Sequence, residues 1–263
     1  MVSMEKEYLM AKLLAEERQN RIVEILNKNG SYKIADLAEV LNVSKETIRR
    51  DLIILNEQGR VKKSYGGAVA YELKTKNMAT RIDDNLQIKT MICERALEYI
   101  PDQGVIYLDT GSTVTCLAHL LKEKSGLTII TNSLSAINAL VGSNNTVIIT
   151  GGQLNSTNMS MEGYQASTFL STVKFELAVF GSNGFEGHKG PTTCDFLDVQ
   201  AKQIALNNAR TSIVLAEGIK GTTTSLTQYT SWHNIDYLIT DRTIPDEIIS
   251  SLEDATSVII ADK

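Results

Sequence analysis

The feature that most constrains the fold is an alternation of short apolar runs with helical segments over residues 104–263. Seven runs are continuous: VIYLD at 105–109, LTIIT at 127–131, TVIIT at 146–150, FELAVF at 175–180, SIVLA at 212–216, YLIT at 237–240 and VIIA at 258–261. Helices are predicted between them at about Val114–Lys124, Leu134–Gly142, Tyr164–Ser171, Phe196–Asn208 and Asp246–Glu253. Continuous runs are typical of strands buried on both faces. The pattern predicts an α/β fold with a mostly parallel sheet and right-handed crossovers.

Small polar residues and glycines follow four of these strands. The four segments are Asp109-Thr110-Gly111-Ser112-Thr113, Thr131-Asn132-Ser133, Gly151-Gly152 and Gly181-Ser182-Asn183-Gly184. Ligands bind at the carboxyl ends of strands in such sheets, and a helix that begins at Ser112 would offer its free amides to a phosphate. Any single segment is better explained by ordinary turn chemistry. Four of them on one edge favour a binding site.

The first 70 residues predict three helices and a two-stranded wing. The helices run from about Leu14 to Asn29, Ile34 to Leu41, and Ser44 to Gln58, with Ser44 as an N-cap and glycines after the first and third. Their apolar stripes are Ile22, Ile25 and Leu26; Ile34, Leu37, Ala38 and Leu41; and Ile48, Leu52 and Leu55. Val61, Tyr65 and Val69 predict short strands around Gly66-Gly67. Two helices joined by the short turn Asn42-Val43 are typical of a helix-turn-helix.

Positive charge is concentrated where this arrangement would meet DNA. The chain has a net charge of −5, but residues 1–70 contain 12 Lys/Arg and 10 Asp/Glu, against 14 and 21 in the remainder. The candidate DNA-binding residues are Ser44, Lys45, Thr47, Arg49 and Arg50 around the third helix, with Lys62 and Lys63 in the wing. The alternative is a three-helix bundle that binds a protein, but that would not require so many cations there.

Length and composition favour a two-domain cytoplasmic protein. We expect a winged helix-turn-helix domain at 1–70, a linker at 71–81, and an α/β domain at 82–263 that opens with a helix at about 82–99. No apolar run approaches the length of a membrane span, and the mixed charges near the N-terminus disfavour a secretory signal. Cys93, Cys116 and Cys194 are scattered, so we expect reduced thiols, no metal site and no cofactor.

The segment Val43–Val69 resembles the DNA-binding end of the DeoR family of bacterial sugar-metabolism repressors. The matching residues are Ser44, the run Thr47-Ile48-Arg49-Arg50-Asp51-Leu52, the pair Gly66-Gly67, and Arg21 with Ile25 upstream. The resemblance covers about residues 18–263. It implies a repressor whose larger domain is related to sugar-phosphate isomerases and coenzyme A transferases and senses a phosphorylated sugar or similar metabolite.

The larger domain resembles the family loop by loop. Asp109-Thr110-Gly111-Ser112-Thr113 is similar to the family's Asp-x-Gly-Thr-Thr loop, and Gly190-x-Thr192-Thr193 followed by Lys202 is similar to another segment, as is Ile239-Thr240-Asp241. The candidate effector-binding residues are Asp109, Gly111, Ser112, Thr113, Asn132, Ser133, Gly151, Gly152, Gly181, Gly184, Thr192, Lys202 and Lys220. Glu217, Gly218 and Ile219 replace the family's Asp-Ser-Ser before Lys220, Pro191 interrupts the Thr-Thr segment, and Ser112 replaces a threonine. The altered loop leaves the ligand's identity open.

Two hypotheses follow from these residues. The preferred one is a regulator that binds double-stranded operator DNA as a homo-oligomer, a dimer or tetramer, and responds to a small effector. The other is a sugar-phosphate isomerase or acyl transferase in which Asp109, Glu217, Asp241, Lys202 and Lys220 supply acid–base groups. The apolar lead-in at 8–14 would either assist self-association or pack on the first domain.

Overall fold

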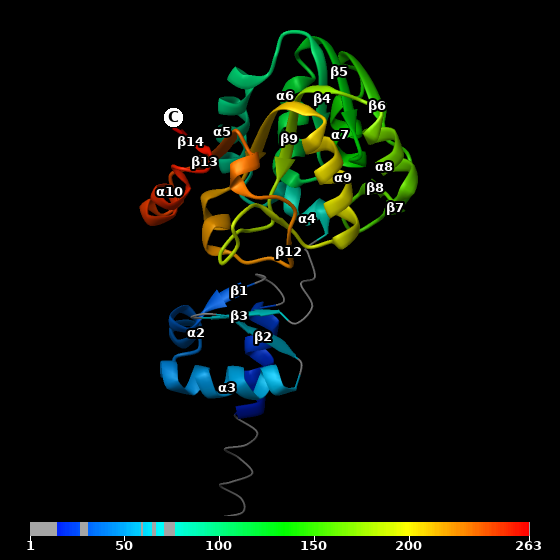
Figure 1. The fold of residues 1–263 in the computed structure, drawn as a ribbon. Coiled ribbons are helices and arrows are strands. Elements are labelled where there is room, and N and C mark those ends of the chain that lie inside the picture. Colours follow the sequence, from blue (N-terminus) through cyan, green and yellow to red (C-terminus); the bar gives the residue numbers. More distant parts are fainter. Residues whose placement is uncertain (1–14, 27–30, 59, 65–66, 71–76, 263) are drawn as a thin grey trace, which may run out of the picture. The chain divides into compact units, whose positions relative to one another are not determined.

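A computed structural model describes residues 15–26, 31–58, 60–64, 67–70 and 77–262 (Figure 1). The chain divides into two compact units, Met1–Thr75 and Lys76–Lys263. Among the residues described, the smaller unit has one hydrophobic core of its own, and the larger unit has two. No helix within the described ranges is long and apolar enough to cross a membrane.

The smaller unit contains the three predicted helices and the wing. A helix covers residues 15–26, and it is followed by β1 (Ser31–Lys33), α2 (Ile34–Val40), α3 (Lys45–Glu57), β2 (Val61–Ser64) and β3 (Gly67–Ala70). Ser44 is the N-cap of α3, as predicted. The predicted apolar stripes meet in one core, in which Ile22, Leu26, Leu37, Ile48, Leu52, Leu55 and Val61 are fully buried. The predicted helix stops at Gly30 and Gly59, and the turn residue Gly66, lie outside the described residues.

The sequence did not predict β1. This strand pairs antiparallel with β3, placing Tyr32 opposite Ala68, and completes a three-stranded sheet with β2. Three residues directly before a helix are too few to establish a period of two, so this strand depends on its partner rather than on a local pattern.

The larger unit is built on a seven-stranded sheet whose strands are all parallel. The strands are β4 (Gly104–Leu108), β5 (Ser125–Thr131), β6 (Asn144–Ile149), β9 (Phe175–Gly181), β11 (Ala209–Leu215), β13 (Tyr237–Asp241) and β14 (Ser257–Ala261), in the order β14-β13-β11-β9-β4-β5-β6. All seven coincide with predicted runs. After β4, the strands β5 and β6 are added on one side of it, and β9, β11, β13 and β14 are added on the other. The strand order therefore switches direction between β4 and β9, and the loops that leave such a switch point frame a crevice.

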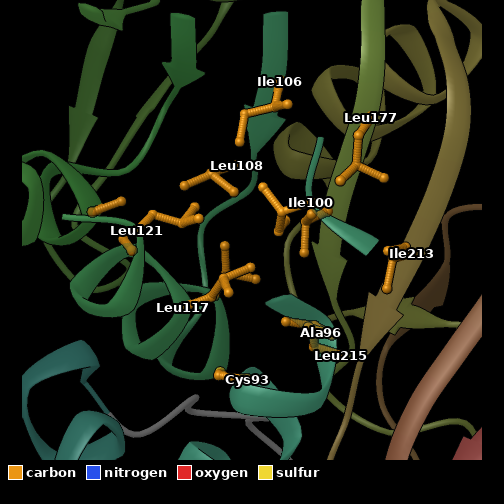
Figure 2. Packing of buried hydrophobic residues seen from close by; sticks show 14 of the residues in the cluster. Cys93, Ala96, Ile100, Ile106, Leu108, Leu117, Leu121, Leu177, Ile213 and Leu215 are labelled. Atoms are coloured by element: carbon orange, nitrogen blue, oxygen red, sulfur yellow. The ribbon is translucent and has the colours of Figure 1, made fainter. Parts of the chain in front are cut away.

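Helices cover both faces of this sheet because successive strand residues point to opposite sides. Ile106 and Leu108 enter one core with α5 (Leu86–Ala96), α6 (Ser112–Leu121) and α7 (Leu134–Leu140), as Figure 2 shows for part of it. Tyr107 enters the other core with α8 (Tyr164–Ser171), α9 (Phe196–Asn207) and α10 (Asp246–Leu252). The five predicted helices between strands are therefore present, with shifts of a few residues at their ends.

The predicted linker is wrong at its C-terminal end. Residues 78–81 belong to α4 (Met78–Asp83), which is capped by the side chain of Asn77 and buries Met78. The predicted helix at 82–99 is instead three pieces: the end of α4, the helix α5 after a break at Asn85, and a 3₁₀ turn at Leu97–Tyr99. Asn85 has a left-handed backbone (φ 53°), which interrupts the helix.

Short strands at the loop end of the sheet were also missed. The hairpin of β7 (Gln153–Asn155) and β8 (Ser160–Glu162) follows β6, and β10 (Thr192–Thr193) pairs with β12 (Thr227–Gln228). Each has two or three residues per strand, too few for a pattern. Both lie in the connections that follow the carboxyl ends of sheet strands, and both shape the site described next.

Candidate functional site

The smaller unit exposes the predicted cations on α3. Lys45, Arg49 and Arg50 are exposed, whereas Ile48, Leu52 and Leu55 of the same helix are buried. Arg49 lies 3.2 Å from Glu46 in an exposed pair that costs little to break. Lys62 and Lys63 lie on β2, and their side chains are outside the described residues. The helix thus presents a basic, solvated face opposite its packed face.

Two of the predicted DNA-binding hydroxyls are engaged in the helix cap. The Ser44 hydroxyl accepts from the amide of Thr47 at 3.1 Å, and the two side-chain oxygens lie 2.9 Å apart. Ser44 therefore fixes the start of α3, which offers its remaining first-turn amides to an approaching anion.

An ion pair between the half-buried Arg18 and the buried Asp51 holds α3 to the first helix. The Asp51 carboxylate, 3% exposed, accepts from Arg18 Nε at 2.6 Å and Nη2 at 3.1 Å, and from Gln19 Nε2 at 3.0 Å. The hydrogen bond to Asp51 raises the pKa of Arg18. This contact ties α3 to the first helix, a role of Asp51 that its place in the family motif did not predict.

In the larger unit, the four predicted loops meet at one edge of the sheet. The strands β9, β4, β5 and β6 are neighbours and run in parallel, so their carboxyl ends lie together. Gly111 begins α6 without a side-chain cap, so the first-turn amides of this ten-residue helix are not satisfied by a capping side chain. Ser112 and Thr113 form this first turn.

Lys202 links two buried carboxylates at this edge. Its ammonium contacts Asp109 Oδ2 and lies 3.1 Å from Asp198 Oδ2, and all three residues are at most 3% exposed. Gly181 N donates to Asp109 Oδ2 at 3.2 Å, and Thr193 Oγ1 donates to Asp198 Oδ2 at 2.8 Å. Burial raises the pKa of Asp109 to about 6, although Lys202 opposes the shift. Burial alone would lower the pKa of Lys202, but attraction to Asp109 and Asp198 outweighs it and raises that pKa.

Asn132 lies fully buried at the end of β5. Its Oδ1 accepts from the hydroxyl of Tyr107 at 3.0 Å, and its backbone carbonyl accepts from Met161 N of β8 at 2.7 Å. Ser133 is occupied differently, since its hydroxyl caps α7 by accepting from Ala136 N. Asn132 therefore has a fixed carboxamide oxygen and an available nitrogen, whereas Ser133 has a structural task.

Arg81 reaches the same edge from α4, within the predicted linker. Its Nη2 donates to Asn158 Oδ1 at 3.1 Å, and the backbone carbonyl of Asn158 accepts from Thr110, the residue between Asp109 and Gly111. Burial lowers the pKa of Arg81, opposed by the charges of Cys194 and Asp198. Arg81 and Asp198 were not among the predicted site residues, and the one sequence signal for Asp198 was its i, i+4 spacing from Lys202.

Four buried side-chain atoms at this edge have no hydrogen-bond partner among the described residues. They are Asp109 Oδ1, Asp198 Oδ1, Asn132 Nδ2 and Arg81 Nε; across the described residues, the single further buried atom of this kind is Thr256 Oγ1. Buried polar groups are almost always hydrogen-bonded, and leaving one unpaired costs about 1–3 kcal/mol. Two of these atoms are acceptors and two are donors, and their residues lie in the loops and helices around the carboxyl ends of the sheet strands.

Several predicted residues shape the loops instead. Thr192 donates to the carbonyl of Gly184, and a Cβ on Gly184 would lie 2.2 Å from the carbonyl oxygen of Thr223. A Cβ on Gly152 (φ 119°) would likewise clash with the carbonyl oxygen of Glu162. Gly151 has an open surrounding. Gly184 and Gly152 thus permit close backbone packing.

The carboxylates considered for catalysis do not all converge. Asp241 accepts from Gly218 N at 2.6 Å and from Thr243 N at 2.9 Å, so it fixes its own turn. Glu217 accepts from Asn85 Nδ2 at 2.6 Å and lies 4.0 Å from Lys89. Lys220 lies in the 3₁₀ turn Gly218–Thr222, where its carbonyl accepts from Phe185 N. No group of three metal-ligating side chains occurs among the residues with described positions.

Comparisons with known proteins match both units. The model of the DeoR-like helix-turn-helix domain matches residues 18–74, and that of the DeoR C terminal sensor domain matches residues 84–242, more than half of the chain. The transcriptional regulator GolR of Listeria innocua is 32% identical over 91% of this chain and 95% of its own length. The glycerol-3-phosphate regulon repressor of Escherichia coli K12 is 28% identical over 90% and 95%.

A solved ribose 5-phosphate isomerase from Methanocaldococcus jannaschii is 19% identical, with a TM-score of 0.39 over 52% of this chain and 55% of its own. This likeness is too weak to bear on function. The exposed basic helix, the sensor-domain match and the full-length relatives agree. The chain belongs to the DeoR family of DNA-binding transcriptional regulators, not to a family of enzymes.

Proposed function

We propose that the chain represses a sugar or related carbon-metabolism operon in the cytoplasm and that a phosphorylated sugar or polyol releases it from operator DNA. The observation that carries this proposal is the set of four unpartnered buried atoms at the strand edge, beside the uncapped start of α6. The choice of repression over activation is supported by relatives that are named as repressors, including the glycerol-3-phosphate regulon repressor.

The chemistry of the unpartnered atoms suits such a metabolite. Asp109 and Asp198 each offer a buried carboxylate oxygen, which is a hydrogen-bond acceptor. A sugar hydroxyl can donate to such an oxygen. Asn132 Nδ2 and Arg81 Nε are donors that require oxygen lone pairs. The first turn of α6, with the hydroxyls of Ser112 and Thr113, suits the phosphate. The other predicted positions, Gly111, Gly151 and Gly181, would let the backbone approach.

On the DNA side, we propose that α3 enters the major groove and that two or more copies bind together. Arg49 and Arg50 are the candidate base or phosphate contacts, and the exposed Lys45 lies one turn earlier in the same helix. A single helix-turn-helix spans few base pairs, so a dimer or tetramer would supply the second half-site.

The test is fluorescence anisotropy of the full chain on DNA from its own upstream region, at stated salt, titrated with aldose, ketose and polyol phosphates. We expect specific binding that one phosphorylated compound releases, whereas its dephosphorylated form does not. Specific binding that no compound changes would overturn the effector assignment. Equal affinity for upstream and shuffled DNA would overturn the operator assignment.

A further inference from the structure

The segment that first follows the boundary between the two units contributes a polar group to the strand edge. The larger unit begins at Lys76, and α4 begins at Met78. Met78 N donates to the carbonyl of Thr157 at 3.0 Å, and Arg81, one helical turn later, donates to Asn158. Two hydrogen bonds therefore fasten α4 to the loop between β7 and β8.

That loop is itself part of the strand edge. Its backbone carbonyl at Asn158 accepts from Thr110 Oγ1 at 3.2 Å, and that at Met159 accepts from Leu134 N at 2.8 Å. The loop thus bridges the ends of β4 and β5, and α4 is fastened to the bridge. If α4 moves relative to the sheet, either its hydrogen bonds to this loop break or the loop moves with it.

Arg81 is only partly satisfied in this position. Asn158 takes one of its five N–H groups, while the Nε atom is buried and without a partner. Asp198 attracts the guanidinium, yet no hydrogen bond between the two is formed, and the carboxylate's own Oδ1 is also unpartnered. A ligand oxygen able to accept from Arg81 and a hydroxyl able to donate to Asp198 would satisfy both atoms.

We infer that Arg81 binds an oxygen of the effector and thereby transmits occupancy of the strand edge to α4, the element that follows the boundary with the DNA-binding unit. This inference rests on the proposed function. The effector changes operator affinity because it binds more tightly in the α4 position that offers Arg81 than in any other. The route within the described residues is a short chain of contacts from the effector through Arg81 to α4.

The experiment compares full-length wild type with Arg81→Lys and Arg81→Gln. Lysine keeps the charge but lacks the Nε and planar fork, and glutamine removes the charge. The exposed Arg242, which pairs with Asp262, supplies the control Arg242→Gln. For each protein we would measure the Kd of the panel's releasing sugar phosphate by calorimetry and the fraction of operator released at ligand saturation. Thermal unfolding without ligand, and operator affinity without ligand, would establish that each variant folds.

We expect both Arg81 variants to bind the sugar phosphate about tenfold or more weakly. At saturation they should also release less operator than wild type, and Arg242→Gln should match wild type in both. Wild-type Kd in Arg81→Lys and Arg81→Gln, or full release at saturation, would overturn the role of Arg81 while leaving the proposed function intact. If no compound binds wild type, the proposed function fails, and the inference fails with it.

Discussion

Lys202 of α9 contacts Asp109 at the end of β4 across 93 residues of sequence, and both side chains are buried. Replacing Lys202 with methionine keeps most of the side-chain volume but leaves Asp109 and Asp198 without their shared cation. We expect Lys202→Met to lower the free energy of unfolding by about 3–5 kcal/mol, measured by urea titration of the full chain.

The matched control for this substitution is Lys122→Met on the exposed end of α6, expected to change stability by less than about 0.5 kcal/mol. The double variant Lys202→Met with Asp109→Asn should lose less than the sum of the single changes, because the two residues are in contact. Additive losses would mean that the pair is not coupled.

Asp109 should make stability depend on pH in a narrow window. Its pKa is raised to about 6 from an ordinary value of 3.8 because it is buried, so the folded chain holds its proton more tightly than the unfolded chain. The stability from this group is full below about pH 4 and is lost as pH rises toward 6. The difference in unfolding free energy between wild type and Asp109→Asn, taken from pH 4.5 to 6.5, should follow this fall; a constant difference would contradict it.

The Arg18–Asp51 pair should matter for both stability and DNA binding. Asp51→Ala removes three hydrogen bonds to a buried carboxylate, so we expect a loss of about 2–4 kcal/mol and weaker operator binding as α3 loses its orientation. Glu46→Ala removes an exposed carboxylate–arginine contact on the same helix and should cost less than about 0.5 kcal/mol. Equal losses of unfolding free energy in the two variants would contradict the prediction that the buried pair is worth more than the exposed one.

Arg49 and Arg50 should carry operator recognition without carrying stability. Both are exposed, so Arg49→Ala and Arg50→Ala should leave thermal unfolding nearly unchanged. A bidentate base contact would cost about 1–3 kcal/mol of specific affinity on removal, whereas a phosphate contact would weaken specific and random DNA alike and reduce the salt dependence. Anisotropy at several salt concentrations separates these cases. Wild-type binding by both variants would remove α3 from the interface.

The sequence was sufficient to predict the architecture because the same strand pattern recurs along the larger unit. Buried parallel strands must be continuously apolar, so VIYLD and the six similar runs predicted all seven strands of the main sheet. The helices of the smaller unit followed from apolar spacing, and Ser44 was predicted as a cap because its side chain can accept a backbone amide. These features depend on residues that are close in sequence, so they can be predicted from the sequence alone.

The parts that the sequence did not predict depend on which polar atoms the folded chain brings into contact. Arg81 was assigned to a linker because its surroundings lack an apolar period, yet its partner is Asn158, 77 residues away. In the sequence, Asp198 is one of several acids on predicted helices. Its burial against Lys202 and Thr193 is seen only in the folded structure. Thr192 and Ser133 were predicted as ligand contacts, but their hydroxyls are engaged in a loop and a cap. Hydrogen bonding of this kind cannot be read from spacing.

The most direct test of the sensor site is a calorimetric titration of Asn132→Asp with the releasing sugar phosphate. This near-isosteric change keeps an oxygen for the Tyr107 hydroxyl but replaces the unpartnered donor with a carboxylate oxygen, which repels an anion and cannot donate. The account predicts binding at least about tenfold weaker than wild type at pH 7.5, with the unliganded variant still folded and bound to operator. Wild-type affinity in Asn132→Asp would contradict the account, because the buried donor would then not face the effector.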